Sequence, residues 1–212
     1  MQTVAASPAE IRRPLPAEEA ARADFYALLA RLFQGSPDAK LLQTLAIAPP
    51  LEGDGADAAL ARAWIDLVRA SAVFDPEAAQ EEYERLFVGV GKAPVSIYSA
   101  FYRTGATAMN HPRVVLREDL LALGLAQRQG ANEPEDHFAV LFETMRILVA
   151  GGGGREPAGI EEQKRFFDKH IEPGVAKFLS ATRLAPEANY YRKVAALGEA
   201  FIFIEEESFS LG

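Results

Sequence analysis

The stretch NEPEDHFAVLFETMR, residues 132–146, joins a dense polar cluster to a helical apolar pattern. Its first half carries three carboxylates and His137, one of only three histidines in the chain. Apolar side chains then recur at spacings of three and four residues, which predicts an amphipathic helix over residues 133–149. These apolar residues are Phe138, Leu141, Phe142, Met145, Leu148 and Val149.

The polar cluster has the composition of a helix N-terminus. Asn132 is predicted to be the N-cap and Glu135 the third helical residue of a capping box, with the carboxylates facing the positive end of the helix. Asp136 and His137 would then lie beyond the cap. Asp136 would be free to bind a partner's arginine or to orient His137, and His137 would sit at the edge of the apolar face. The alternative for His137 is a hydrogen-bonded core histidine.

The remainder of the chain also reads as helix, and no pair of alternating strands with hairpin turns is visible. Asp75 with Pro76 marks one helix start, and Gly124 marks one helix end. Residues 95–110 fit either an extended segment or a helix. Further helices are predicted over residues 17–33, 37–47, 58–72, 76–88, 112–123 and 157–170. A short helix should follow Pro173-Gly174, and a last long helix should begin at Pro186. Residues 151–154, all glycine, are predicted to form a flexible loop.

The expected fold is therefore all-α, one domain of about ten helices over residues 17–212. Its two helical halves, 17–124 and 133–212, are joined by a linker at 125–132. Residues 1–16 are expected to be a disordered tail, because three prolines interrupt them and they lack the apolar run of a secretory signal.

Composition narrows the classes of partner. The chain has 212 residues and a net charge of −8. This negative charge disfavours nucleic acid and anionic lipid as partners and favours a basic peptide or protein. No window has the 18 or more apolar residues of a membrane span, and the absence of cysteine excludes thiolate metal sites and disulfides. We therefore expect a cytoplasmic protein with no integral membrane segment.

Catalytic and metal motifs are weak. No glutamate stands three residues before any histidine, so the di-iron pattern of helical bundles is missing. Asp136 and His137 are adjacent on the predicted helix and would point about 100° apart, which disfavours a shared metal ion. No phosphate loop or nucleophile elbow occurs. The sequence therefore predicts no catalytic residue and no metal site. Two alternative functions stay open: a small GTP hydrolase that uses Asp136 and His137, and a structural assembly adaptor.

Several short motifs occur together in a characteristic order. They are YERLFVG (83–89), Pro94-x-Ser96-x-Tyr98, Glu133-Pro-x-Asp-His137, EQKRFFDKHIEPGVAKF (162–178) and NYYRKVAALGEAFI (189–202). In order and spacing they resemble the TorD/DmsD family of cytoplasmic redox-enzyme maturation chaperones, over about residues 20–206. Two departures stand out: Gly174 replaces the family's usual tryptophan, and Gly89-Val90-Gly91 replaces its Gly-Pro.

The resemblance implies an all-helical chaperone rather than an enzyme. Its expected partners are the twin-arginine signal peptide and the apo-catalytic subunit of a molybdopterin oxidoreductase, whose export it would hold back until the cofactor is inserted. It implies no resident cofactor, although weak guanine nucleotide binding occurs in parts of the family. A monomer is expected, with a domain-swapped dimer through the 125–132 linker as the alternative.

A signal peptide combines a basic segment with an apolar segment, so the chaperone needs an apolar groove beside its acidic surface. We expect its wall around Tyr83, Leu86, Phe87, Tyr98 and Phe101, although ordinary core is an equally good interpretation of Leu86 and Phe87. A tyrosine can bury its ring while its hydroxyl stays in contact with water, so the tyrosines are the better candidates for the groove wall. The predicted peptide-binding residues are Tyr83, Phe87, Tyr98, Tyr102, Glu133, Asp136 and His137.

Overall fold

The computed structural model describes residues 15–55, 57–89, 93–103, 111–125 and 134–211. Within these ranges the chain forms nine α-helices, two short π-helices and one 3₁₀ turn, with isolated β-bridges in place of strands. The all-α prediction is therefore confirmed. The elements are α1 (Ala17–Gln34), α2 (Ala39–Ala46), α3 (Asp57–Ser71), α4 (Pro76–Tyr83), η1 (Glu84–Val88), η2 (Ser99–Tyr102), α5 (Pro112–Ala122), α6 (Phe138–Ala150), α7 (Ile160–Phe166), η3 (Phe167–Ile171), α8 (Glu172–Leu184) and α9 (Tyr190–Leu211).

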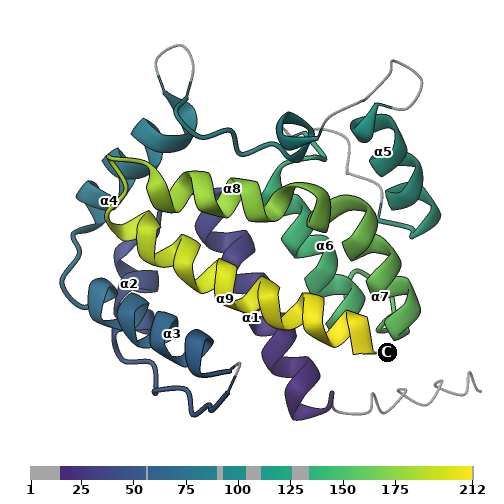
Figure 1. Cartoon of the computed structure of the whole chain (residues 1–212), viewed down its shortest axis with the longest axis horizontal. Helices are drawn as coiled ribbons and strands as arrows, with labels where there is room; N and C mark the ends of the chain where they lie inside the picture. Colours follow the sequence, from purple (N-terminus) through teal and green to yellow (C-terminus); the bar gives the residue numbers. More distant parts are fainter. Residues whose placement is uncertain (1–14, 56, 90–92, 104–110, 126–133, 212) are drawn as a thin grey trace, which may run out of the picture.

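Helices from both ends of the sequence pack together. Helix α1 packs against α6, while α9 lies between α3 and α8 and runs along the front of the molecule in Figure 1. One continuous hydrophobic cluster takes residues from α1, η1, α6, α8 and α9. Residues before and after the segment 126–133 therefore share a single core.

Aromatic side chains fill the centre of this core. The Phe33 ring of α1 lies 4.8 Å from that of Phe178 on α8, and Phe178 stacks on Phe138 of α6 at 4.3 Å. These three rings are fully or almost fully buried. Such ring pairs add about 0.5–1.5 kcal/mol each beyond the burial of their area. The beginning of α6 is thus anchored directly in the core.

Two local sequence signals have the predicted structure. The Asp75 carboxylate accepts the backbone N–H groups of Glu77 and Ala78, with Pro76 at the first helical position of α4. Gly124 has a φ of 70°, and the N–H of Leu125 bonds back to the carbonyl of Leu120. Both are the expected cap geometries.

The predicted start of α6 is wrong. The helix begins at Phe138 rather than 133, and its N-cap is His137, whose Nδ1 accepts the backbone N–H of Ala139 at 3.1 Å. Asn132, the predicted cap, lies outside the described residues. Glu135 is likewise not the third residue of a helix but part of the turn before it.

Three other helix starts also differ from the prediction. Helix α9 begins at Tyr190 instead of Pro186, because the buried Glu82 carboxylate of α4 accepts the N–H groups of Asn189, Tyr190 and Tyr191 at 2.8–3.0 Å. Helix α7 begins at Ile160, with Gly159 as its cap residue, instead of Pro157. The pair Pro173-Gly174 does not break the helix but lies in the first turn of α8, directly after η3.

Two less regular segments complete the fold. Residues 95–98 are extended and lead into the 3₁₀ turn η2. Gly151–Gly154 form a turn closed by two hydrogen bonds between Gly152 and Arg155. In the described residues, every helix is too short or too polar to cross a membrane.

Candidate functional site: an aromatic groove at the start of α6

The extended segment 95–98 is joined to the turn before α6 by backbone hydrogen bonds. The N–H of Ser99 donates to the carbonyl of Asp136 at 2.8 Å, and the N–H of Phe138 donates to the carbonyl of Ile97 at 3.0 Å. Tyr98 and His137 face each other across this antiparallel bridge. Two sequence motifs separated by about 40 residues are thereby held edge to edge.

Asp136 holds this junction from inside. Its side chain is 3% exposed; Oδ2 accepts the N–H of Ala100 at 3.4 Å, and Oδ1 lies 2.9 Å from Nε of Arg113 on α5. The carboxylate thus caps η2 and forms an ion pair with the chain's own arginine. It does not face open surface, so any role for Asp136 in binding is one of positioning.

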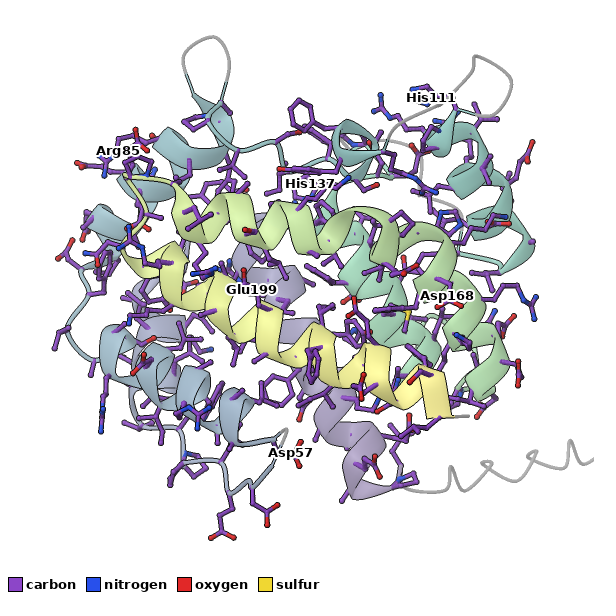
Figure 2. The ribbon with its side chains drawn as sticks, viewed as in Figure 1. Asp57, Arg85, His111, His137, Asp168 and Glu199 are labelled. Atoms are coloured by element: carbon purple, nitrogen blue, oxygen red, sulfur yellow. The ribbon has the colours of Figure 1, made fainter. Side chains whose placement is uncertain are left out.

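His137 combines a helix cap with a place in the groove wall. Burial lowers the pKa of His137 to about 4, so the ring is neutral at neutral pH. Because Nδ1 accepts the N–H of Ala139, the proton of the neutral ring lies on Nε2. The ring meets Tyr98 edge to face, with centroids 5.5 Å apart. In the view of Figure 2, His137 lies just above α8 and inside the outline of the molecule.

A pocket of about 600 Å³ opens beside this junction, and we call it the aromatic groove. It contains four predicted binding residues, Tyr83, Phe87, Tyr98 and His137, and Phe101 of the predicted wall. Phe101 is 61% exposed, so its ring is accessible to a ligand in the groove. The other lining residues are Val88, Ala93, Pro94, Ser96 and Ile97, so among the described residues no side chain that is ionised at neutral pH lines the groove.

The YERLFVG motif forms one wall of the aromatic groove through the π-helix η1. The π-turn buries Leu86 and Phe87 and leaves Val88 60% exposed. Leu86 is therefore a core residue, as the alternative interpretation held, whereas Phe87 belongs to both core and groove. Gly89 follows with a φ of 60°, and a Cβ there would lie 3.0 Å from Cα of Ala93. Single π-turns are often found at functional sites.

The other predicted binding residues lie outside the groove lining. The Tyr102 hydroxyl donates to the carbonyl of Ser96 at 2.7 Å, and its ring packs near Phe138 and Phe178. Partial burial raises the pKa of Tyr102 to about 12. Tyr102 thus supports the wall from behind. Glu133 lies outside the described residues.

Gly174, where the family usually has tryptophan, lies directly behind η2. A Cβ on Gly174 would meet Cβ of Tyr102 at 3.3 Å and the carbonyl of Ser99 at 3.4 Å. The small residue therefore lets η2 approach α8 closely. In this chain Tyr102 and η2 occupy space that a large side chain at 174 would need.

Helix α5 is held beside the junction by ion pairs. Nε of Arg117 donates to Glu135 at 2.9 Å, and this bond lowers the pKa of the Glu135 carboxyl. Farther along α5, Asp119 accepts from Lys169 and from the buried His170. Glu135 and Asp136, the two described acids of the EPEDH motif, are therefore paired with arginines of α5 rather than left open for a partner.

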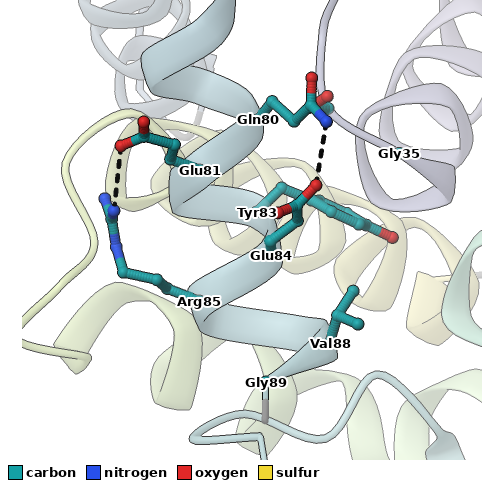
Figure 3. A pocket seen from close by; sticks show the side chains of 9 residues that line it. Gly35, Gln80, Glu81, Tyr83, Glu84, Arg85, Val88 and Gly89 are labelled. Carbon is teal, nitrogen blue, oxygen red and sulfur yellow. Dashed lines mark hydrogen bonds and ion pairs between the residues drawn. The ribbon is translucent and has the colours of Figure 1, made fainter.

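A second pocket, of about 590 Å³, lies on the other side of Tyr83 and Val88 (Figure 3). We call it the α4 pocket. Residues from the end of α1 and from α4 and η1 line it: Gly35, Ser36, Gln80, Glu81, Tyr83, Glu84, Arg85, Val88 and Gly89. Unlike the aromatic groove, it contains ionised side chains. Among the described residues, no three histidine or carboxylate side chains gather as a metal ion would require.

Comparison with known families decides the classification. A family model described as nitrate reductase delta subunit matches residues 54–180, more than half of the chain. The chain belongs to the nitrate reductase delta subunit family. This confirms the resemblance to redox-enzyme maturation chaperones. No curated protein matches the chain at a significant level.

Members of the nitrate reductase delta subunit family are chaperones of molybdoenzyme maturation that bind molybdoenzyme subunits and are not themselves catalytic. The matched residues include every residue that lines the aromatic groove. Of the residues that the sequence predicts for the site, Tyr83, Phe87, Tyr98, Phe101 and His137 line the groove, whereas Val88 was not predicted. Its exposure comes from the π-turn, for which the sequence gives no signal.

Proposed function

We propose that the chain is a system-specific chaperone whose aromatic groove binds the twin-arginine signal peptide of a molybdopterin oxidoreductase. It would also contact the apo-catalytic subunit, assist cofactor insertion and delay export, acting in the cytoplasm without catalysis. One observation carries this proposal. An aromatic pocket whose described lining has no ionised side chain, with Phe101 61% exposed, opens on the surface of an acidic protein from a molybdoenzyme chaperone family.

The energetics require such a groove. Exposed arginine–carboxylate pairs contribute about 0.2–1 kcal/mol each, whereas a micromolar complex needs about 8 kcal/mol. Burial of apolar area at about 25 cal/mol per Å² has to supply the larger part, and association costs are subtracted from it. The apolar segment of a signal peptide laid over Val88, Tyr98 and Phe101 would provide that burial.

The buried polar residues act in this proposal by positioning the groove. Asp136 fixes η2, and with it Phe101, through the N–H of Ala100. His137 fixes the start of α6 and supports Tyr98. Its Nε2–H is a hydrogen-bond donor in the groove wall. Glu133 remains a predicted contact of the peptide.

The hydrolase alternative gains no support from this arrangement. Its required acid–base pair would be Asp136 and His137, but the Asp136 carboxylate is buried and bonded to Arg113 and Ala100. Weak guanine nucleotide binding, and the choice between a monomer and a domain-swapped dimer, remain predictions.

Titration calorimetry with a synthetic twin-arginine signal peptide tests the proposal. At low and at moderate salt the peptide should bind, with an affinity that falls as salt rises but does not vanish, because apolar burial is not screened. The control is a peptide of equal composition in which both the arginine pair and the apolar segment are scrambled. Equal binding of the two peptides would refute the proposed function.

A further inference from the structure

The aromatic groove and the α4 pocket are neighbours with two shared walls. Tyr83 and Val88 line both of them, so a ligand crossing these two residues touches both pockets. Val88 is 60% exposed, and it forms an apolar surface between the two. Together they offer a surface long enough for an extended segment rather than a compact ligand.

The two pockets differ in charge. In the part of the chain that the structure describes, no side chain that is ionised at neutral pH lines the aromatic groove, whereas Glu81, Glu84 and Arg85, with a summed charge of −1, line the α4 pocket. Glu81 pairs with Arg85 at 3.3 Å, while Glu84 accepts from the neutral amide of Gln80 at 2.9 Å. Among the residues that line this pocket, Glu84 is thus the acid that is bonded to a neutral group (Figure 3).

Two helix ends add to the negative potential of the α4 pocket. Helix α1 ends at Gln34, and Gly35 and Ser36 line the pocket; η1 ends at Val88, and Gly89 lines it. The C-terminal end of a helix carries a partial negative charge and favours cations. The chain's own Arg31 already uses this environment, donating from Nη1 to the carbonyls of Gly35 and Ser36 at 3.2–3.3 Å.

We propose that a bound peptide lies in one direction across Tyr83 and Val88, with its basic segment over the α4 pocket and its apolar segment in the aromatic groove. Glu84 and the C-terminal end of η1 would receive the arginine side chains, beside the end of α1 that Arg31 already occupies. This proposal rests on the proposed function and adds the orientation of the peptide to it. The charge difference between two joined pockets matches the order of charge along a signal peptide, basic first and apolar second.

A double-mutant cycle tests this orientation by calorimetry at low salt. The protein is taken as wild type and as Glu84→Gln, and the peptide with its arginine pair and with both arginines replaced by glutamine. Glu84→Gln should weaken binding of the arginine peptide about threefold and leave the glutamine peptide unchanged, as expected for an exposed charge pair. Charge reversal in Glu84→Lys should weaken the arginine peptide about tenfold.

Glu77→Gln is the matched control, because Glu77 is an exposed glutamate of α4, which runs directly into η1, and it lines neither pocket. It should change binding of neither peptide by more than about 1.5-fold, the lower limit for one exposed charge pair. If wild type binds the arginine peptide but Glu84→Gln has no larger effect than Glu77→Gln, the orientation is overturned and the proposed function survives. If wild type binds neither peptide, both are overturned.

Discussion

Helices α5 and α6 begin in the same way but in different surroundings. Each is capped by a histidine whose Nδ1 accepts a backbone N–H, from Arg113 to His111 at 3.3 Å and from Ala139 to His137 at 3.1 Å. Figure 2 shows His111 at the outer edge of the molecule and His137 farther inside. His111 is exposed, whereas His137 is 3% exposed and lines the aromatic groove.

The comparison separates a local cap from a cap that is part of a site. At α5 the His111 imidazole caps only its own helix. At α6 the same imidazole also supports Tyr98, and the neighbouring Asp136 holds η2. A substitution at the α6 start should therefore affect stability, pH dependence and peptide binding together, whereas one at the α5 start should affect little besides α5.

The largest effect is expected from Gly174→Trp, which disrupts the packing of η2 against α8 behind the start of α6. The indole has no space against Tyr102 and Ser99, so η2 must move away from α8. We expect a loss of about 3 kcal/mol in the free energy of unfolding and at least tenfold weaker peptide binding. Urea denaturation and peptide titration measure the two.

Gly159→Trp is the control for that substitution, because nothing lies within 4 Å of a Cβ at Gly159. It should leave peptide binding unchanged. Unaltered binding by Gly174→Trp would show that the position of η2 does not shape the groove.

The next effect is a loss of stability on acidification. Burial lowers the pKa of His137 to about 4, below its value of about 6.5 in the unfolded chain, so the unfolded state binds the extra proton between these two pH values. The contribution of neutral His137 to the free energy of unfolding is therefore present above pH 6.5 and is lost as the pH falls toward 4. The share of His137 is about 2 kcal/mol between pH 7 and pH 5.

Burial also lowers the pKa of His170, which adds a loss of the same sign. His137→Asn keeps an oxygen acceptor at the cap but removes the titrating group. Urea denaturation at both pH values should show a drop about 2 kcal/mol smaller in this variant than in wild type. An identical drop in the two proteins would rule out His137 as a source of the pH dependence.

Asp136→Asn should have an effect of about 1 kcal/mol on stability, because it removes the charge paired with the half-exposed Arg113 but keeps an acceptor for Ala100. Peptide binding should weaken only a few-fold, through a looser η2. Glu135→Gln is the control, since the Glu135 carboxylate accepts from Arg117 of α5 rather than from η2. Abolished binding with unchanged stability would instead mean that the Asp136 carboxylate contacts the peptide directly.

The smallest effect is expected at the exposed cap. His111→Asn should change the free energy of unfolding by less than about 0.5 kcal/mol, because asparagine caps helices well and the site is solvated. Peptide affinity should not change. A stability loss equal to that of His137→Asn at neutral pH would erase the distinction between the two caps.

The difference between a local cap and a cap that depends on distant residues also explains which helix ends could be predicted from the sequence. Caps made by neighbouring residues were predictable: Asp75 and Pro76 at α4, and Gly124 after α5. The start of α9 was not, because its cap is Glu82, more than 100 residues away in sequence. At α6 the asparagine–glutamate pattern resembled a capping box, but pairing with residues 97–100 sets the helix start at His137.

The groove was predictable in part for a similar reason. Tyrosines, a phenylalanine and a histidine in short motifs indicated a surface site, and Tyr83, Tyr98 and His137 do come together. The exposure of Val88 depends on the π-turn, and the burial of Asp136 depends on Arg113 of α5. Contacts of this kind arise from tertiary packing, which no local pattern encodes.

Replacing one exposed phenylalanine at a time tests most directly whether the aromatic groove is the peptide site. Phe101 lines the groove and is 61% exposed, while Phe203 on α9 is 52% exposed and does not line it. A peptide covering about half of a phenylalanine side chain gains about 1.5 kcal/mol, so Phe101→Ser should weaken signal-peptide binding about tenfold. Phe203→Ser should bind like wild type, with both variants checked for an unchanged melting temperature. Equal affinities for Phe101→Ser and Phe203→Ser would contradict the assignment of the aromatic groove as the binding site.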